Sequence, residues 1–273
     1  MQHRRQQALL LAGLCAFTFA SLVPVLWGLL TSLKQPVDAF AIPPKIVFEP
    51  TLLFHYEVWV ERGFWSFLVN SLIVSFGTMA ISVPLGSMAA YALARTQQPY
   101  RQKVLFGLLA IRMFPQILLA VPFFVMANVL GLIDTYAALI IAFVAVNQPF
   151  TIWLMRSFIV DVPRDLDEAA RIDGASEWQI FWKVILPTVR PGLLVTALFS
   201  FLLGYNEFLF ALILSGSGTK TLPVAVAEYG GEDVAYWSLS AAAAIGIMLP
   251  ALVFTLIAHK HLVRGFTAGA VKQ

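Results

Sequence analysis

Charged residues are scarce in this chain. Asp, Glu, Lys and Arg make up only 12% of its 273 residues, about half of the share that a soluble domain usually carries. Hydrophobic residues make up 59%, and the mean hydropathy is +0.80. This composition argues against a soluble globular domain and predicts an integral membrane protein.

Several kinds of functional residue are also missing. Cys15 is the only cysteine, so no internal disulfide bond can form. No basic cluster with interleaved aromatic residues is present, so nucleic acid is not expected as a partner. The four histidines do not form a metal-ligand set, and no combination of nucleophile, acid and base is recognisable. The segment GSGTKT at residues 216–221 has Thr219 where a phosphate-binding loop needs glycine before the lysine. We interpret it as a surface turn and expect no enzymatic activity from this chain.

Long uncharged runs, by contrast, are abundant. A helix that crosses the hydrocarbon core of a bilayer needs about 20 apolar residues. Six runs meet this requirement, and only the third and the fifth hold a charged residue, Arg112 and Glu207 respectively. The pattern predicts an all-α membrane protein that forms a single transmembrane domain over residues 1–273. Its six expected spans are residues 8–30, 66–94, 104–132, 135–155, 191–214 and 236–258.

The placement of lysine and arginine predicts the orientation, because cytoplasmic loops carry the excess of these residues. With the N-terminus inside, Arg112 lies within a span and only four of the 18 lysines and arginines fall outside: Lys34, Lys45, Arg62 and Lys220. Both termini are therefore predicted to be cytoplasmic. A cleaved signal peptide is the alternative for the first run, but this run is longer than the 7–15 apolar residues of a signal core.

The longest inner connection, residues 161–190, is predicted to form two short helices. Asp161 is expected to cap the first helix, with Pro163 in its first turn. Acidic residues crowd the start of this helix, where its dipole favours negative charge. Asp167 and Arg171 are four residues apart and are expected to pair on one face.

The second half of this connection carries its own signals. Gly174 is expected to end the first helix in a left-handed conformation. Ser176 and Gln179 form a capping box that opens the second helix. This second helix presents an apolar face of four residues: Ile180, Phe181, Val184 and Ile185. The composition leaves two interpretations open, an amphipathic hairpin on the bilayer surface and a docking element for another protein.

A longer motif runs through the same connection. Glu168-Ala169-Ala170, then Gly174, then residues 185–187 (ILP) resemble the signature loop of permeases in binding-protein-dependent ABC importers. In that family the first loop helix docks into a groove of the nucleotide-binding subunit and transmits the closure of that subunit to the spans. The resemblance implies that the coupling contact of this chain consists of Glu168, Ala169, Ala170, Asp173 and Gly174.

The resemblance extends over most of the chain. Four further segments are similar to the sugar-importing branch, and in particular to the second permease of maltose-type systems: residues 70–72 (NSL), 206–209 (NEFL), 222–224 (LPV) and 265–272 (GFTAGAVK). The resemblance implies a multi-pass protein of the prokaryotic inner membrane. It also implies four partner subunits, namely a second homologous permease, two ATP-binding subunits that hold ATP and Mg²⁺, and an extracytoplasmic solute-binding protein. No cofactor is expected in this chain itself.

Polar residues within the expected spans are candidates for the substrate path. They are Arg112, Asn147, Gln148, Asn206 and Glu207. An ionisable group at such depth is costly and by default faces a cavity or a partner. A hydrogen bond between helices is the alternative role for these side chains, and it is the preferred interpretation for Glu207. A pair between Arg112 and Glu207 is also considered, although their expected depths differ by about 10 Å.

Two functions from other classes remain as alternatives. An ion-coupled secondary transporter would need charged relays and internal inverted repeats, and the sequence displays neither. In a membrane scaffold or a membrane enzyme, residues 161–190 would be incidental. The loop motif favours the importer permease over both.

Overall fold

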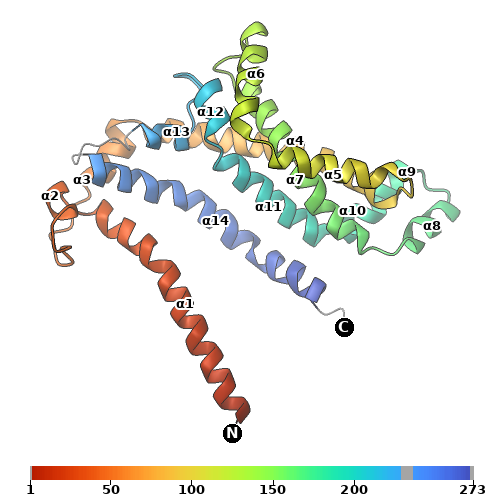
Figure 1. Ribbon diagram of the computed structural model, residues 1–273, viewed down its shortest axis with the longest axis horizontal. Helices are drawn as coiled ribbons and strands as arrows, with labels where there is room; N and C mark the ends of the chain where they lie inside the picture. The colour runs from red at the N-terminus through yellow and green to blue at the C-terminus, as the bar shows by residue number, and fades with distance from the viewer. Residues whose placement is uncertain (1, 229–235, 271–273) are drawn as a thin grey trace. The chain divides into compact units, whose positions relative to one another are not determined.

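The structure is a computed structural model that describes residues 2–228 and 236–270. Within these ranges the chain is helical and contains no strand, which confirms the prediction of an all-α protein (Figure 1). The first half forms α1 (Gln2–Ser32), α2 (Pro36–Ala39), α3 (Leu53–Tyr56), the π-helical η1 (Glu57–Glu61), α4 (Phe64–Arg95), α5 (Tyr100–Met113), α6 (Gln116–Val129) and α7 (Tyr136–Val160). The second half forms α8 (Asp165–Ile172), α9 (Glu177–Gln179), the π-helical η2 (Ile180–Ile185), α10 (Leu186–Thr188), α11 (Arg190–Tyr205), α12 (Leu209–Leu214), α13 (Leu222–Ala227) and α14 (Trp237–Ala270).

In the described part of the chain, four helices are long and apolar enough to cross a membrane: Arg5–Ser32, Phe64–Arg95, Tyr136–Val160 and Trp237–Ile257. Two bent pairs pass the same test of length and composition. Tyr100–Met113 meets Gln116–Val129 at 89°, and Glu177–Thr188 meets Arg190–Tyr205 at 85°. The count therefore reaches six when each bent pair is taken as one span.

The third expected span, residues 104–132, is not one helix, and this expectation was wrong in its detail. The chain breaks between α5 and α6, where Phe114 is extended with φ −68° and ψ 135°. The cause is Pro115, which disfavours helical geometry in the residue before it and has no N–H to donate. Pro122, by contrast, is accommodated within α6.

The fifth expected span, residues 191–214, is likewise divided. It contains α11 and α12, which are separated by residues 206–208. At its N-terminal end α11 follows α10 across a sharp bend, so the apolar run of residues 177–188 adjoins it. Pro187 and Pro191 stand on either side of that bend at helix starts, where a missing N–H costs little.

The helices fall into two compact units, and α4, α13 and α14 each pass from one unit to the other. Unit 1 comprises residues 1–66 and 225–249. In this unit Gly246 packs so closely on Trp59 that an added Cβ atom would lie 1.8 Å from the indole ring. Lys34 is buried at 1% exposure, with its ammonium 4.6 Å from the Trp27 ring centroid, so the aromatic face offsets part of the cost of burying that charge.

Unit 2 comprises residues 67–224 and 250–273. Small and hydroxyl residues let its helices approach closely. The Ser82 hydroxyl on α4 donates to Gln148 Oε1 on α7 at 2.8 Å and lies 3.2 Å from the Thr151 hydroxyl. Two turns farther along α7, a Cβ atom at Gly192 on α11 would lie 2.3 Å from Phe158 Cγ. Without water to drive helices together, such close contacts and interhelical hydrogen bonds hold membrane bundles.

Asp134 ties together one end of unit 2. Its carboxylate accepts hydrogen bonds from the N–H groups of Gly216 (2.8 Å), Gly218 (3.0 Å) and Thr219 (2.8 Å) and from the Thr219 hydroxyl (2.7 Å). These bonds, with that of the Thr219 hydroxyl the most important, lower the pKa of Asp134 to about 2. The segment 216–221 is therefore a turn, as expected, and Asp134 fixes it through four hydrogen bonds.

The same turn is fixed from α4. Asn70 Nδ2 donates to the carbonyl groups of Gly218 and Lys220, while Asn70 Oδ1 accepts from the Tyr136 hydroxyl at 2.6 Å. The Ser71 hydroxyl accepts from the N–H of Leu222 at 2.7 Å. Residues 70–72, which resemble the importer family in sequence, thus act here as a structural anchor for the turn.

A matched pair of glycine substitutions tests the close packing of α7 on α11. In Gly192→Ala the new methyl group meets the Phe158 ring, and we expect a loss of about 1–3 kcal/mol in stability. In Gly107→Ala on α5 nothing lies within 4 Å, and better helix propensity should leave stability equal or about 1 kcal/mol higher. The thermal unfolding of each purified variant in detergent measures both effects. Equal shifts in the two variants would contradict the packing described here.

Candidate functional site

The hairpin of residues 161–190 joins α7 to α11 and contains α8, α9, η2 and α10. Its local geometry follows two sequence signals. Gly174 has φ +83°, a left-handed conformation that ends α8 at little cost only in glycine. Ser176 and Gln179 form the expected capping box, with Gln179 N to Ser176 Oγ at 3.3 Å and Ser176 N to Gln179 Oε1 at 2.9 Å. Both predictions are confirmed.

The start of the first hairpin helix was predicted wrongly. Asp161 does not cap α8, because its backbone is helical (φ −74°, ψ −13°) and it ends α7 instead. An N-cap residue needs an extended backbone to turn its side chain onto the first N–H groups. The helix α8 begins only at Asp165, and Arg164 before it makes no side-chain cap.

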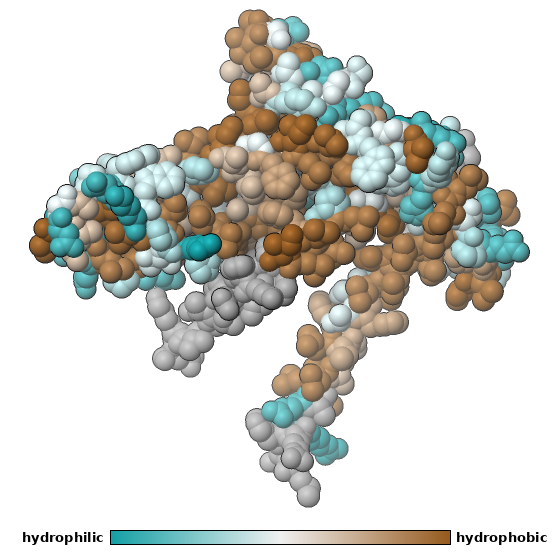
Figure 2. Space-filling view, turned by 180° about the vertical axis from the view of Figure 1, so that it is seen from behind, coloured by the Kyte–Doolittle hydropathy of each residue, from teal (hydrophilic) through white to brown (hydrophobic). Residues whose placement is uncertain are grey.

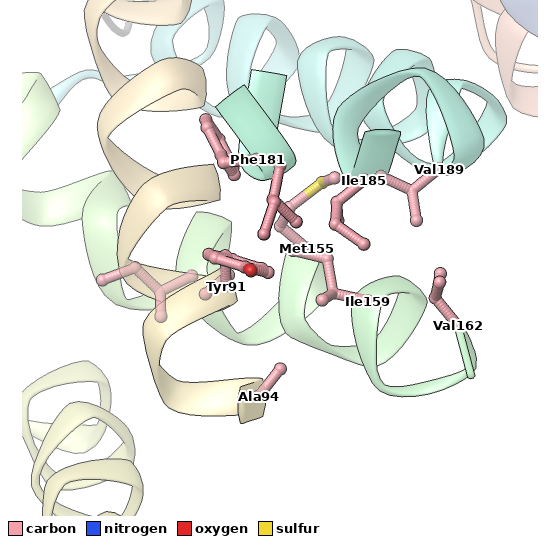
Figure 3. Packing of buried hydrophobic residues seen from close by; sticks show 11 residues of the cluster. Tyr91, Ala94, Met155, Ile159, Val162, Phe181, Ile185 and Val189 are labelled. Carbon is pink, nitrogen blue, oxygen red and sulfur yellow. The ribbon is translucent and has the colours of Figure 1, made fainter. Parts of the chain in front are cut away.

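A hydrophobic core lies beneath the hairpin (Figure 3). Tyr91 and Ala94 of α4, Met155 and Ile159 of α7, and the η2 residues turn their side chains toward one another. The fully or nearly buried members of η2 and the bend after it are Ile180, Phe181, Ile185 and Val189. The predicted apolar face of the second hairpin helix is therefore confirmed, and its contacts join the hairpin to two long helices at once.

One buried carboxylate completes this attachment. Asp167 is 2% exposed and accepts a hydrogen bond from the Tyr91 hydroxyl at 2.7 Å. Its other oxygen lies 2.8 Å from Nη2 of Arg95, the last residue of α4, and Arg95 Nη1 donates to the Val162 carbonyl at 3.1 Å. These contacts clamp α8 onto the end of α4.

The expected pair of Asp167 with Arg171 is therefore wrong. Asp167 turns inward to Arg95, and Arg171 Nε donates instead to Glu177 Oε1 at 2.7 Å across the hairpin. This hydrogen bond lowers the pKa of Glu177, but both side chains are about half exposed, and such pairs contribute little to stability. The sequence did contain a signal for the clamp, since Tyr91 and Arg95 are four residues apart and share one face of α4.

The hairpin presents the other residues of its motif to the outside. Glu168, Ala169, Asp173 and Gly174 are exposed, whereas Ala170 is half-buried against the core. Four large apolar side chains are also exposed on the hairpin: Leu166 (40%), Ile172 (86%), Trp178 (62%) and Trp182 (38%). Figure 2 shows pale and teal residues gathered at the end of unit 2 that carries the hairpin. These apolar side chains are accessible for contact with another protein.

The polar residues of α7 face inward. Asn147 is buried at 5% exposure, and Gln148 accepts the hydrogen bond from Ser82 on α4. For Gln148 the structure thus displays the hydrogen bond between helices that was the alternative to a place on the substrate path.

Asn206 and Glu207 lie where the fifth expected span breaks. Asn206 Nδ2 donates to the Leu202 carbonyl at 2.8 Å, and Glu207 Oε1 accepts from the N–H of Phe210 at 3.1 Å, in the first turn of α12. Arg112 lies with its guanidinium 5.5 Å from the Phe150 ring centroid. No ion pair within 4 Å joins Arg112 to Glu207.

The sequence is similar to those of known transport proteins. Residues 82–268 match the family described as binding-protein-dependent transport system inner membrane component. The chain is 38% identical over 260 residues to the trehalose transport system permease protein SugB of Mycobacterium tuberculosis, covering 92% of this chain and 93% of the relative. It is 33% identical over 272 residues to the trehalose/maltose transport system permease protein MalG of Thermococcus litoralis, covering 98% and 97%.

A solved structure shares the fold. A chain from the crystal structure of a bacterial ABC transporter involved in the import of the acidic polysaccharide alginate superposes with a TM-score of 0.74 at 21% identity, over 94% of this chain and 96% of that one. The residues 265–272, which resemble the family, lie outside the part whose side chains the structure describes.

Substitutions in the clamp test whether Asp167 holds the hairpin. Asp167→Ala leaves the Arg95 charge partly buried without its partner, and we expect the hairpin to lose about 3–5 kcal/mol of local stability. Replacing both residues, as in Arg95→Met with Asp167→Leu, should recover most of this loss because no charge remains buried. Limited proteolysis of the hairpin measures the local opening.

Arg171→Gln is the control for this experiment. It removes a half-exposed cation from the same hairpin and should change the rate of proteolysis little. If the Asp167→Ala hairpin were cleaved no faster than the Arg171→Gln hairpin, the clamp would have no stabilising role.

Proposed function

The chain belongs to the family of inner-membrane components of binding-protein-dependent transport systems, and we propose that it forms half of the translocation path of a carbohydrate importer. As a permease of an ABC importer it is a non-catalytic, multi-pass subunit of the inner membrane, and ATP is hydrolysed by a partner ATPase.

The names of the relatives support a carbohydrate as the solute. Trehalose occurs in the names of SugB and of MalG, and each of these proteins aligns over more than nine-tenths of its length with this chain. The proposed solute is therefore a disaccharide or a related oligosaccharide, delivered to the outer face by a solute-binding protein.

The proposed topology has six spans in one membrane domain, with both termini and the hairpin in the cytoplasm. The excess of lysine and arginine on this side supports it. A second, homologous permease completes the path, and two ATP-binding subunits bind ATP and Mg²⁺. No cofactor is proposed for this chain.

The hairpin is the proposed receiver of force from the ATPase. Leu166, Ala169 and Ile172 follow one another at three-residue spacing on α8, so they share an exposed face that can enter a groove of the ATPase. The motif residues Glu168, Asp173 and Gly174 border this face. Ala170 packs inward, and its proposed role is to let α8 approach the core closely.

The contacts of Asp167 and the hydrophobic core beneath the hairpin then transmit the movement of α8 to α4 and α7. Asp167 ties α8 to Arg95 at the end of α4, and the η2 side chains pack on α7. A displacement of α8 therefore acts on two long helices together, because neither contact can be stretched without exposing a buried charge or apolar surface.

The break between α11 and α12 is the proposed segment nearest the solute. Irregular backbone within a membrane is tolerated where it is buried in protein or lines a cavity. Asn206 is exposed there and can reach a sugar hydroxyl group, while Glu207 stabilises the first turn of α12. Asn147 and Gln148 are proposed to hold α7 against α4, and Arg112 remains a candidate for the wall of the path.

A charge placed on the exposed face of α8 tests the docking proposal. In Ile172→Glu the new carboxylate would have to be buried in the interface, and we expect at least about a tenfold loss of bound ATPase. Val47→Glu is the matched control, since Val47 is also 86% exposed but lies in the proposed outer loop. The yield of ATPase co-purified with each variant measures the effect. Equal retention by both variants would refute docking through α8.

The solute class is tested with the reconstituted complex. ATP hydrolysis should rise severalfold when the binding protein is supplied with trehalose, maltose or a related oligosaccharide, and should not respond to amino acids. Stimulation by amino acids alone would overturn the carbohydrate proposal. Uptake that persists without any ATPase would indicate a self-sufficient carrier instead.

A further inference from the structure

A pocket rich in arginine lies where α4 and α7 end and α5 begins. It has a volume of about 360 Å³. Its charged lining residues are Arg95, Arg101, Arg156, Arg164 and Asp161. They belong to unit 2, and none of them belongs to the exposed face of α8 that is proposed to meet the ATPase.

Two of these arginines form no ion pair in the described part of the chain, although Asp161 lines the same pocket. Arg95 is paired with Asp167, and Arg164 Nη2 donates to the Ala94 carbonyl at 3.4 Å. Arg101 and Arg156 form no ion pair with any described residue, and they are close enough to repel each other. The Nε atom of Arg156 is buried without a hydrogen-bond acceptor among the described residues. Two partly buried cations and an unused donor make this pocket suited to an anion.

A separate, largely apolar groove lies between α5 and α7. A second cavity of about 220 Å³ is lined by Leu108, Leu109, Arg112, Pro149, Phe150 and Trp153. On α7, Trp153, Arg156 and Val160 are spaced by three and four residues, so both cavities open on one face of that helix. Trp153 is 49% exposed and Val160 is 48% exposed, so this face also offers apolar surface to the surroundings.

We propose that this site binds one anionic phospholipid. The phosphate group would accept hydrogen bonds from Arg101 and Arg156, and an acyl chain would lie along the groove beside Phe150 and Trp153. A basic pocket between helices on the cytoplasmic side suits an anionic head group. Inorganic phosphate would leave the groove unfilled, and an acidic protein segment would not bring an alkyl chain to it. Only the assignment to the inner leaflet rests on the proposed topology.

The position of Arg95 gives the site a link to the hairpin. This residue lines the pocket and also pairs with Asp167. A lipid phosphate in the pocket would therefore lie next to the clamp. Arg95 is for this reason left unchanged in the experiment below, which alters only the two arginines without a partner.

The experiment counts lipids that stay on the intact transporter. The complex of this chain with its permease and ATPase partners is extracted from nanodiscs that contain equal amounts of phosphatidylglycerol and phosphatidylcholine. The retained lipids are then counted from the mass of the complex. We expect the Arg101→Gln, Arg156→Gln variant to prefer phosphatidylglycerol about 30-fold less than the native complex. Arg101→Lys with Arg156→Lys should restore most of the preference.

A matched variant distinguishes lipid binding in the pocket from nonspecific attraction of anionic lipid to a positively charged protein. Lys103→Gln with Lys183→Gln also removes two cations, but both lysines are exposed and neither lines the pocket. It should keep the preference of the native complex. An equal loss in both double variants, or no loss in either, would overturn the proposal. ATPase that stays bound to every variant confirms that the complexes are assembled.

The groove is tested with lipids that carry bromine on an acyl chain. Brominated phosphatidylglycerol should quench the tryptophan fluorescence of the native complex more than that of the Trp153→Phe variant. Equal quenching by brominated phosphatidylcholine would indicate ordinary boundary lipid and would overturn the proposal. Displacement of phosphatidylglycerol by millimolar inorganic phosphate would assign the pocket to free phosphate instead. A disulfide bond between the Trp153→Cys variant and a cysteine introduced into the partner permease would show that protein covers the groove, and this too would overturn the proposal.

Discussion

The carboxylate of Asp167 is the contact on which the hairpin depends. It lies on a short helix of eight residues, which in isolation is marginal in water. The Tyr91 hydroxyl and the Arg95 guanidinium meet it at the C-terminal end of α4, and the core of η2 side chains packs around them. A short polar helix thereby becomes a rigid extension of the long helices. This rigidity is needed if the hairpin is to transmit a movement of the ATPase. A hairpin held only by its two connections would bend instead of moving the long helices.

Local signals in the sequence predicted the hairpin well. Its contacts with residues far away in the sequence could not be predicted in this way. Gly174 and the Ser176–Gln179 box act over three or four residues, so the chain itself determines their geometry. The partner of Asp167 lies more than 70 residues away, and a pattern rule that considers only neighbours chose Arg171 instead. Asp161 was misassigned for a related reason, since α7 continues farther than its apolar run and takes this residue as its own end.

For the expected spans, too, the sequence predicted the apolar segments but not their bends. Apolar length identified the segments that are able to cross a membrane, but it carries no information on where a segment bends. Pro115 breaks its segment while Pro84, Pro122, Pro149 and Pro250 remain inside helices. Neighbouring helices can supply hydrogen bonds to the carbonyl groups that a proline leaves free, so the same residue type has two outcomes. Gln148 is a further case, because only the structure places Ser82 of α4 opposite it.

The turn around Asp134 bears on the conditions that the protein can withstand. The proposed topology places this turn on the outer side, where the surroundings of a cell can become acidic. The pKa of Asp134 falls from its ordinary value of 3.8 to about 2 in the folded protein, so its hydrogen bonds contribute fully above about pH 4 and are lost as the pH falls through about 2. A histidine in the same place would lose its charge near neutral pH. With a carboxylate, this turn keeps the full contribution of its hydrogen bonds down to about pH 4.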